Sequence, residues 1–154
     1  HIMHASKVDE NMLIDHFKVN TLSLFQICKN INSNHRSINI VAISSLYGII
    51  ARINRLPYIV SKHALEGLVK SLSLDFAPNM LVNSISPGFV DTKMTRKNNS
   101  PEKIEEIISK IPTGNLIDVK EIASLVKYFL LKNKSITGQN IIIDGGYSCG
   151  GFEK

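Results

Sequence analysis

Ile38-Asn39-Ile40-Val41-Ala42-Ile43 is a run of apolar and β-branched residues that predicts a buried strand. A loop over residues 46–57 follows this run and ends at Pro57. From Tyr58 to Phe76 the apolar residues recur at helical spacing, which predicts a long helix. A strand followed by a loop and a long helix is the unit from which parallel sheets are built, so this stretch decides the fold.

Helical and extended patterns alternate on both sides of this unit. Upstream, residues 9–32 predict a helix with two apolar stripes, and such a helix is expected to be buried on more than one side. Downstream, residues 81–86 alternate like a strand and stop at Pro87-Gly88. The other predicted elements are a helix after the N-cap Ser100, a helix after the N-cap Asp118 and a last strand over residues 140–144.

The order helix, strand, helix, strand, helix, helix, strand predicts an α/β fold with parallel strands joined by helical crossovers. Three strands form a small sheet with an exposed edge, so we expect further chain or another subunit to complete it. The 154 residues correspond to one domain, residues 1–154. Because His1-Ile2-Met3 is unlike a natural start, we interpret residues 1–8 as an expression remnant or a strand stub.

Composition excludes several classes of protein. The net charge is +5 and the pI about 9.3, but the Lys and Arg residues are scattered and no nucleic-acid recognition motif accompanies them. We therefore expect no nucleic-acid partner. No apolar run has the length of a membrane helix and no secretory leader opens the chain, so no membrane partner is expected. Two cysteines are too few for a disulfide framework and suit no metal site, which favours a cytoplasmic protein without a metal.

Tyr58 and Lys62 are the first candidates for chemistry. They lie four residues apart on a predicted helix and therefore share one face. The ammonium favours the phenolate form of a nearby tyrosine, and such a tyrosine can give a proton to a carbonyl or take one from an alcohol. The structural alternatives are a solvated helix lysine and an amphipathic tyrosine near a helix start.

Ser45 lies 13 residues before Tyr58 at the end of the strand, which is where α/β sheets bind ligands. With these spacings the chain resembles the short-chain dehydrogenase/reductase (SDR) family, from about residue 9 onward. The resemblance rests on residues 43–48 (Ile-Ser-Ser-Leu-Tyr-Gly), 58–62 (Tyr-Ile-Val-Ser-Lys), 82–92 (Val-Asn-Ser-Ile-Ser-Pro-Gly-Phe-Val-Asp-Thr), 137–139 (Thr-Gly-Gln) and 144–146 (Asp-Gly-Gly).

The resemblance implies the second half of a Rossmann-type, doubly wound parallel sheet, and a role for each matching residue. Tyr58 is then the catalytic acid/base, and Lys62 assists it and binds the nicotinamide ribose. Ser45 orients the substrate carbonyl, and Asn20 supports a proton-relay water unless it is a plain surface amide. The residues implied to line the nicotinamide of NAD or NADP are Pro87, Gly88, Val90 and Thr92. Their structural alternatives are a plain turn for Gly88 and an ordinary loop threonine for Thr92.

Two further features follow the resemblance. The helices over 9–32 and 58–76 would form the interface of a homodimer or homotetramer, with Ala64, Gly67 and Ser71 as a small-residue stripe that could equally pack inside one chain. Arg52 and Arg55 would flank the substrate pocket, where they either meet an anionic group or are simply solvated. Lys93, Arg96 and Lys97 pose the same question.

The chain departs from the family at its beginning, because no Gly-x-x-x-Gly-x-Gly turn is present to hold a cofactor pyrophosphate. The expected function is a carbonyl or alcohol oxidoreductase, similar to a 3-oxoacyl-thioester reductase, here as a truncated chain. The alternative is a degenerate, non-catalytic module for assembly or partner binding. Sugar-nucleotide epimerases share the Tyr-x-x-x-Lys pair but lack the ending seen at Asp144–Gly146.

Overall fold

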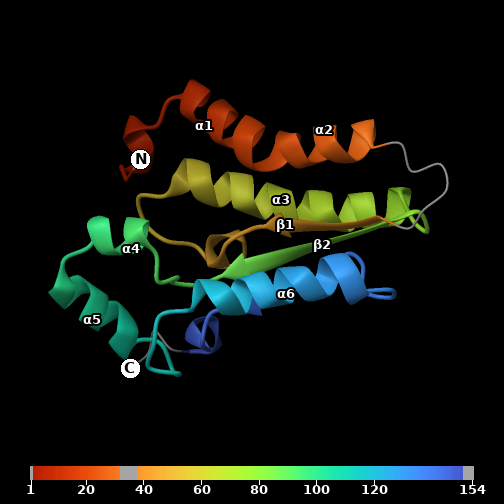
Figure 1. The fold of residues 1–154 in the computed structure, drawn as a ribbon. Helices are drawn as coiled ribbons and strands as arrows, with labels where there is room; N and C mark the ends of the chain where they lie inside the picture. Colours follow the sequence, from red (N-terminus) through yellow and green to blue (C-terminus); the bar gives the residue numbers. More distant parts are fainter. Residues whose placement is uncertain (1, 32–37, 151–154) are drawn as a thin grey trace.

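A three-stranded parallel sheet forms the centre of the molecule (Figure 1). The computed structural model describes residues 2–31 and 38–150. The strands lie in the order β1-β2-β3 and comprise β1 (Ile38–Ile43), β2 (Met80–Pro87) and β3 (Asn140–Ile143). Both strand pairs are parallel, with Ile43 opposite Ile85 and Pro87 opposite Ile143. The predicted α/β class with parallel strands is confirmed.

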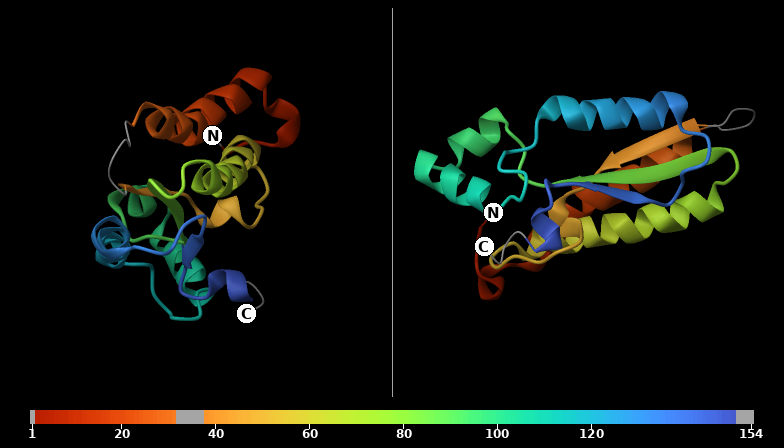
Figure 2. Two further views of the ribbon diagram at one scale, coloured as in Figure 1. Left: turned by 90° about the vertical axis from the view of Figure 1, so that its right-hand side faces the viewer. Right: turned by 90° about the horizontal axis from the view of Figure 1, so that it is seen from below.

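Helices cover both faces of this sheet (Figures 1 and 2). One face carries α1 (Glu10–Phe17), α2 (Ser23–Asn30) and α3 (Leu56–Asp75), and the other carries α6 (Val119–Lys132). The short helices α4 (Lys93–Lys97) and α5 (Pro101–Ser109) lie beyond the carboxyl ends of the strands, together with the described ends of the chain (Figure 2). This end of the sheet is where a parallel α/β fold places its ligand site.

The main core lies between α3, α2 and the sheet. Leu65, Val69 and Leu72 repeat at helical spacing on α3 and are buried in one cluster with Met80 and Val82 of β2. These alternating positions of β2 face α3 because successive side chains of a strand point to opposite faces. The apolar pattern that predicted the long helix therefore fixes the face by which α3 covers the sheet.

The first helical segment differs from the single helix predicted over residues 9–32. A π-helical segment, η2 (Lys18–Leu22), separates α1 from α2, and residue 32 lies outside the described residues. Its second apolar stripe consists of Val19, Leu22 and Phe25. The prediction that this stripe is buried is wrong for Val19 and Leu22, whereas Phe25 is partly buried against the core. Val19 is 71% exposed and Leu22 is 37% exposed, because no described element covers that side.

The remaining local predictions can be compared directly. Ser100 and Asp118 are confirmed as N-caps, and their side chains accept the backbone N–H groups of Lys103 and Lys120. Helix α4 was not predicted. The strand stub proposed within residues 1–8 is wrong for the described part, because Ala5–Lys7 is a 3-10 turn, η1. Within residues 2–31 and 38–150, no helix combines the length and apolarity that a membrane crossing requires.

Candidate active site

Tyr58 and Lys62 lie in the first two turns of α3, next to the carboxyl end of β1. Pro57 precedes them in the first helical turn, where its fixed φ favours the start of a helix. The Lys62 Nζ atom lies 5.7 Å from the centroid of the Tyr58 ring. The predicted sharing of one helix face is therefore observed as a close approach of the ammonium to the phenol ring.

The Lys62 ammonium is held inside the protein rather than in solvent. Lys62 is only 8% exposed, and its Nζ donates a hydrogen bond of 2.9 Å to the carbonyl oxygen of Ile43 at the end of β1. Burial lowers the pKa of Lys62, while the nearby Glu66 carboxylate opposes this shift. A solvated helix lysine would show neither this burial nor this anchor, so the structural alternative for Lys62 is wrong.

Glu66 is a buried acid that the sequence analysis missed. It lies one turn after Lys62 on the same face of α3 and is 9% exposed. Ser84 of β2 donates a hydrogen bond of 2.7 Å to Glu66 Oε2, and the Ser86 hydroxyl lies 3.5 Å from Oε1. The i, i+4 spacing from Lys62 was a signal that could have revealed this acid.

Ser45 begins the short 3-10 turn η3 (Leu46–Gly48) that follows β1. Its hydroxyl oxygen accepts the backbone N–H of Tyr47 at 3.2 Å, and the side chain is partly exposed. Ser44 is buried instead, and its hydroxyl has no hydrogen-bond partner among the described residues. Gly48 lets this turn pack on α3, since a Cβ there would lie 3.1 Å from the Lys62 carbonyl oxygen. Of the two serines, Ser45 is the more accessible.

Asn20 lies in the π-helical segment η2 and is hydrogen-bonded to the turn of α3 that contains Tyr58 and Ser61. Asn20 Nδ2 donates to the Ser61 hydroxyl at 3.0 Å, and that hydroxyl donates to the Tyr58 carbonyl at 2.8 Å. The buried Thr21 hydroxyl donates to the Ser61 carbonyl at 2.8 Å. Widened helical turns of this type often occur at functional sites. Asn20 is thus not a free surface amide, and the segment holds it against α3.

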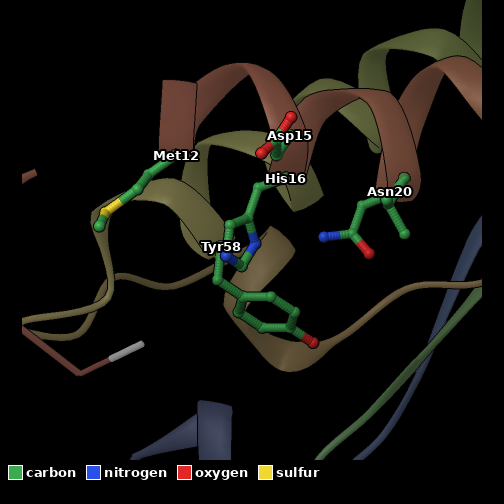
Figure 3. Close-up of a pocket in the computed structure, with 6 residues that line it drawn as sticks. Met12, Asp15, His16, Asn20 and Tyr58 are labelled. Carbon is green, nitrogen blue, oxygen red and sulfur yellow. The ribbon is translucent and has the colours of Figure 1, made fainter. Parts of the chain in front are cut away.

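A cavity of about 370 Å³ opens beside these residues (Figure 3). Asn20 and Tyr58 line it together with Met12, Asp15 and His16 of α1. The His16 ring meets the Tyr58 ring edge to face, with centroids 6.4 Å apart. Part of the Tyr58 side chain is therefore reached from solvent on this side.

The residues after β2 have well-defined backbone roles. A Cβ at Gly88 would lie 2.7 Å from the Asp144 Cβ, so glycine is required here by the neighbouring end of β3. Val90 forms a parallel bridge with Ile117 through its flanking residues, and its carbonyl accepts the Thr95 hydroxyl at 2.7 Å. The Thr92 hydroxyl caps α4 by accepting the Thr95 N–H at 3.1 Å. These residues lie together at the carboxyl end of β2, after Pro87.

The flanking basic residues divide into two groups. Arg96 is exposed and forms a bidentate pair with Asp91, at 2.7 and 2.6 Å, which lowers the pKa of Asp91. Lys93 and Lys97 are exposed on α4. Arg52 instead donates a hydrogen bond of 2.7 Å to the Tyr47 hydroxyl, whose ring lies 6.4 Å from that of Tyr58. Of these four cations, Arg52 is the one linked to Tyr58, through Tyr47.

A tyrosine, a buried lysine and a serine thus lie at the carboxyl end of a parallel sheet, where an α/β fold binds its ligand. The sequence family described as enoyl-(acyl carrier protein) reductase matches residues 3–148. The chain therefore belongs to the short-chain dehydrogenase/reductase family, in agreement with the resemblance of its motifs.

Individual relatives agree with this assignment. The uncharacterized oxidoreductase YmfI of Bacillus subtilis is 32% identical over 97% of this chain and 63% of its own length. The 3-oxoacyl-[acyl-carrier-protein] reductase FabG of Buchnera aphidicola is 37% identical over 83% of this chain and 54% of its own length. The structure of 4-hydroxyisoleucine dehydrogenase complexed with NADH is 29% identical, with a TM-score of 0.87 over 97% of this chain and 64% of that chain. The chain thus spans somewhat less than two thirds of these relatives.

Proposed function

We propose that this chain carries the catalytic residues of an NAD(P)-dependent oxidoreductase that interconverts a carbonyl and an alcohol, similar to a 3-oxoacyl-thioester reductase. The observation that carries the proposal is the buried Lys62 ammonium. It donates a hydrogen bond to the Ile43 carbonyl, and its Nζ atom lies 5.7 Å from the centroid of the Tyr58 ring. Burying an ammonium costs free energy, so its position beside an accessible tyrosine favours a chemical role.

The residues present fit a nicotinamide nucleotide. One donor of the Lys62 ammonium is committed to Ile43, so its other two are free to hold ribose hydroxyls. At Val90 the bridge to Ile117 uses the Phe89 carbonyl and the Asp91 N–H, so the Val90 amide faces the opposite side, where a carboxamide would bind. Pro87, Gly88 and Thr92 would border the nicotinamide ring that carries this carboxamide. A bound nicotinamide supplies the hydride chemistry that the side chains of this chain lack.

The side chains of the chain then manage the proton. In reduction, the Tyr58 hydroxyl donates a proton to the substrate oxygen, and in oxidation the Tyr58 oxygen accepts it. Lys62 stabilises the phenolate that remains, because its positive charge lies close to the ring. Ser45 orients the substrate oxygen toward Tyr58 by donating a hydrogen bond. Asn20, bonded to Ser61 beneath Tyr58, holds the water from which the proton is replaced.

The test separates cofactor binding from chemistry. We expect Tyr58→Phe to abolish reduction of a 3-oxoacyl thioester while leaving the affinity for NADH or NADPH, measured by calorimetry, unchanged. Because the 154 residues contain no pyrophosphate-binding turn, this affinity is expected to be weak. Tyr128→Phe is the matched control, because Tyr128 lies on α6 and is 45% exposed. Unchanged turnover in Tyr58→Phe would contradict the assigned role.

The alternative function is a non-catalytic module, favoured by the lack of a Gly-x-x-x-Gly-x-Gly turn in these 154 residues. Such a module would bind neither NADH nor NADPH and would have no turnover for Tyr58→Phe to remove. Its cofactor titration would be flat, but the missing turn alone also weakens cofactor binding, so only turnover that Tyr58→Phe removes favours the enzyme over the module.

We further propose a homodimer, built on an exposed face of α3. Val60, Ala64, Gly67, Ser71 and Leu74 follow one another at spacings of three or four residues. Val60 is 45% and Leu74 79% exposed, and a Cβ at Gly67 would meet nothing within 4 Å. The stripe therefore does not pack within the described chain, and its small centre allows two helices to approach closely.

Sedimentation measures this association directly. Gly67→Arg should convert the dimer to a monomer, whereas Ser109→Arg, an equal change at an exposed position of α5, should leave it intact. A dimer unaffected by Gly67→Arg would exclude the α3 face. The partly exposed Leu131 and Ile142 would provide a second interface in a homotetramer. Because Cys28 and Cys149 are both free thiols, we also propose a cytoplasmic location.

A further inference from the structure

A second cleft, with a volume of about 230 Å³, is lined by Tyr47, whose ring centroid lies 6.4 Å from that of Tyr58. It lies between the loop after β1, the residue after Gly88, helix α5 and the turn η4 (Tyr147–Cys149). Its principal lining side chains are three aromatic rings and three cations: Tyr47, Phe89, Tyr147, Arg52, Lys103 and Lys110. Its volume is below the range of about 300–1,000 Å³ that is usual for drug-sized ligands, so it suits a small molecule.

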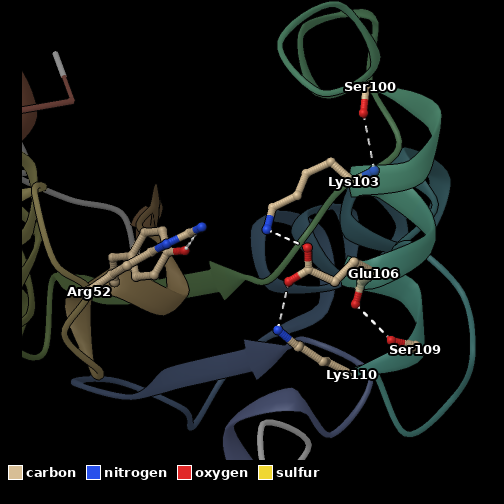
Figure 4. A network of polar contacts seen from close by, with 7 residues as sticks. Arg52, Ser100, Lys103, Glu106, Ser109 and Lys110 are labelled. Atoms are coloured by element: carbon tan, nitrogen blue, oxygen red, sulfur yellow. Dashed lines mark hydrogen bonds and ion pairs between the residues drawn. The ribbon is translucent and has the colours of Figure 1, made fainter.

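The charges of this cleft do not balance (Figure 4). Glu106 is its one lining carboxylate, and it pairs with both Lys103, at 2.6 Å, and Lys110, at 2.8 Å. These two contacts hold the pKa of Glu106 at about 2, so it is ionised at neutral pH. One negative charge therefore faces three positive charges, which leaves an excess of two.

Arg52 accounts for much of this excess. Within the described residues it has no carboxylate partner, and its one recorded hydrogen bond is the 2.7 Å contact to the Tyr47 hydroxyl. Glu106 raises the pKa of Lys110, but the positive charge of Arg52 opposes this shift, so the two cations are close enough to repel. An anion placed between them would relieve this repulsion, and the planar guanidinium suits a carboxylate or phosphate.

The cleft is also adjacent to the proposed reaction centre. The Tyr47 ring meets the Tyr58 ring edge to face, with centroids 6.4 Å apart, and the Arg52 guanidinium carbon lies 6.0 Å from the Tyr47 centroid. Phe89, whose ring packs on that of Tyr147 at 5.2 Å, forms an aromatic wall and directly follows Gly88. A small molecule with its reacting oxygen at Tyr58 could thus extend past Tyr47 to Arg52.

We propose that this cleft binds an anionic group, a carboxylate or a phosphate, of the substrate that reacts at Tyr58. The inference rests on the proposed interconversion of a carbonyl and an alcohol, and it favours small oxo or hydroxy acids or their phosphorylated analogues over the acyl thioesters of the similar reductases. Arg52 is the specificity-determining residue, and Glu106 is an internal anion that competes with the ligand for the two lysines.

The test titrates the 154-residue chain with succinate and, separately, with inorganic phosphate, followed by NMR and calorimetry. We expect saturable binding of at least one anion. The one that binds more tightly shows whether the cleft prefers a carboxylate or a phosphate. Arg52→Gln should weaken binding about tenfold or more, because it removes a hydrogen bond to a charged group. Glu106→Gln should tighten it, because it frees Lys103 and Lys110. Lys97→Gln is the charge-matched control on α4 and should have no effect.

The outcomes separate this inference from the proposed function. Absence of saturable anion binding, or equal affinity in wild type and Arg52→Gln, would overturn the anion site even if the chain binds NADH and reduces neutral ketones. Anion binding that survives in Tyr58→Phe and depends on Arg52 supports the site whether or not turnover is found.

Discussion

Substituting Gly88 by alanine tests how closely the carboxyl ends of β2 and β3 must approach to build the site. An added Cβ would lie 2.7 Å from the Asp144 Cβ and 2.9 Å from the Asp144 Cα. Carbon atoms pack best at about 3.5–4.0 Å, so the two strand ends would have to separate by roughly 1 Å.

Neither strand end can move without losing other contacts. The Gly88 N–H donates to the Ile143 carbonyl at 2.9 Å, and the Asp144 carboxylate accepts the N–H groups of Gly146 and Ser148 at 2.9 and 2.8 Å. Overpacking of this kind costs about 1–3 kcal/mol. For a domain of this size that corresponds to a fall in Tm of roughly 2–12 °C.

Thermal unfolding of the 154-residue chain, followed by circular dichroism, measures the effect. Gly67→Ala is the matched control, since it makes the same chemical change at a helical position where a Cβ meets nothing within 4 Å. Alanine is favoured over glycine there by about 0.5–1 kcal/mol, so this variant should be as stable as wild type or more so. Both variants are compared at one low protein concentration. If Gly88→Ala unfolds at or above the wild-type Tm, the steric argument is wrong.

Three other predictions concern single interactions. Glu106 should titrate near pH 2 by NMR, since Lys103 and Lys110 lower its pKa from 4.5 to about 2. The contribution of these pairs to stability is complete above pH 4.5 and is lost as the pH falls toward 2. This loss should be missing in Glu106→Gln. Thr21→Val should lower the free energy of unfolding by about 0.5–1.5 kcal/mol in urea titrations, because the buried hydrogen bond to the Ser61 carbonyl is lost, while Thr113→Val, the same change at an exposed position, should leave this free energy unchanged. Burial lowers the pKa of Lys62 below 10.5, so the unfolded chain binds the Lys62 proton more tightly than the folded chain does. The free energy of unfolding should therefore rise with pH between the lowered pKa and 10.5. The same rise in Lys62→Met would contradict this assignment to Lys62.

Much of the fold could be predicted from local patterns. The apolar spacing of α3, the β-branched run of β1 and the N-caps Ser100 and Asp118 each depend on residues that are near one another in sequence. For the same reason the sequence placed Tyr58 and Lys62 on one helical face. The spacing of Ser45 from Tyr58 added the family resemblance.

Other features depend on contacts between distant segments and had no local signal. The π-helical turn at Asn20 is hydrogen-bonded to Ser61, 41 residues away. The apolar periodicity of residues 9–32 alone predicted a continuous helix. Glu66 is buried because Ser84 and Ser86 face it from β2, whereas on α3 alone it would be an ordinary surface acid. Val19 and Leu22 are exposed because no described element covers them, and helical spacing carries no information on such cover.

The sequence by itself therefore determined the α/β class, the parallel crossovers and the placement of Tyr58 and Lys62 on one helical face, because side-chain periodicity fixes secondary structure and its faces. Only the tertiary structure decided that Lys62 is buried against Ile43 and that Glu66 lies behind it. It also decided that Arg52, rather than Arg96, faces the cleft beside Tyr47. The physical reason is that burial, charge pairing and cavities arise where elements far apart in the chain meet, and no local pattern encodes which ones will do so.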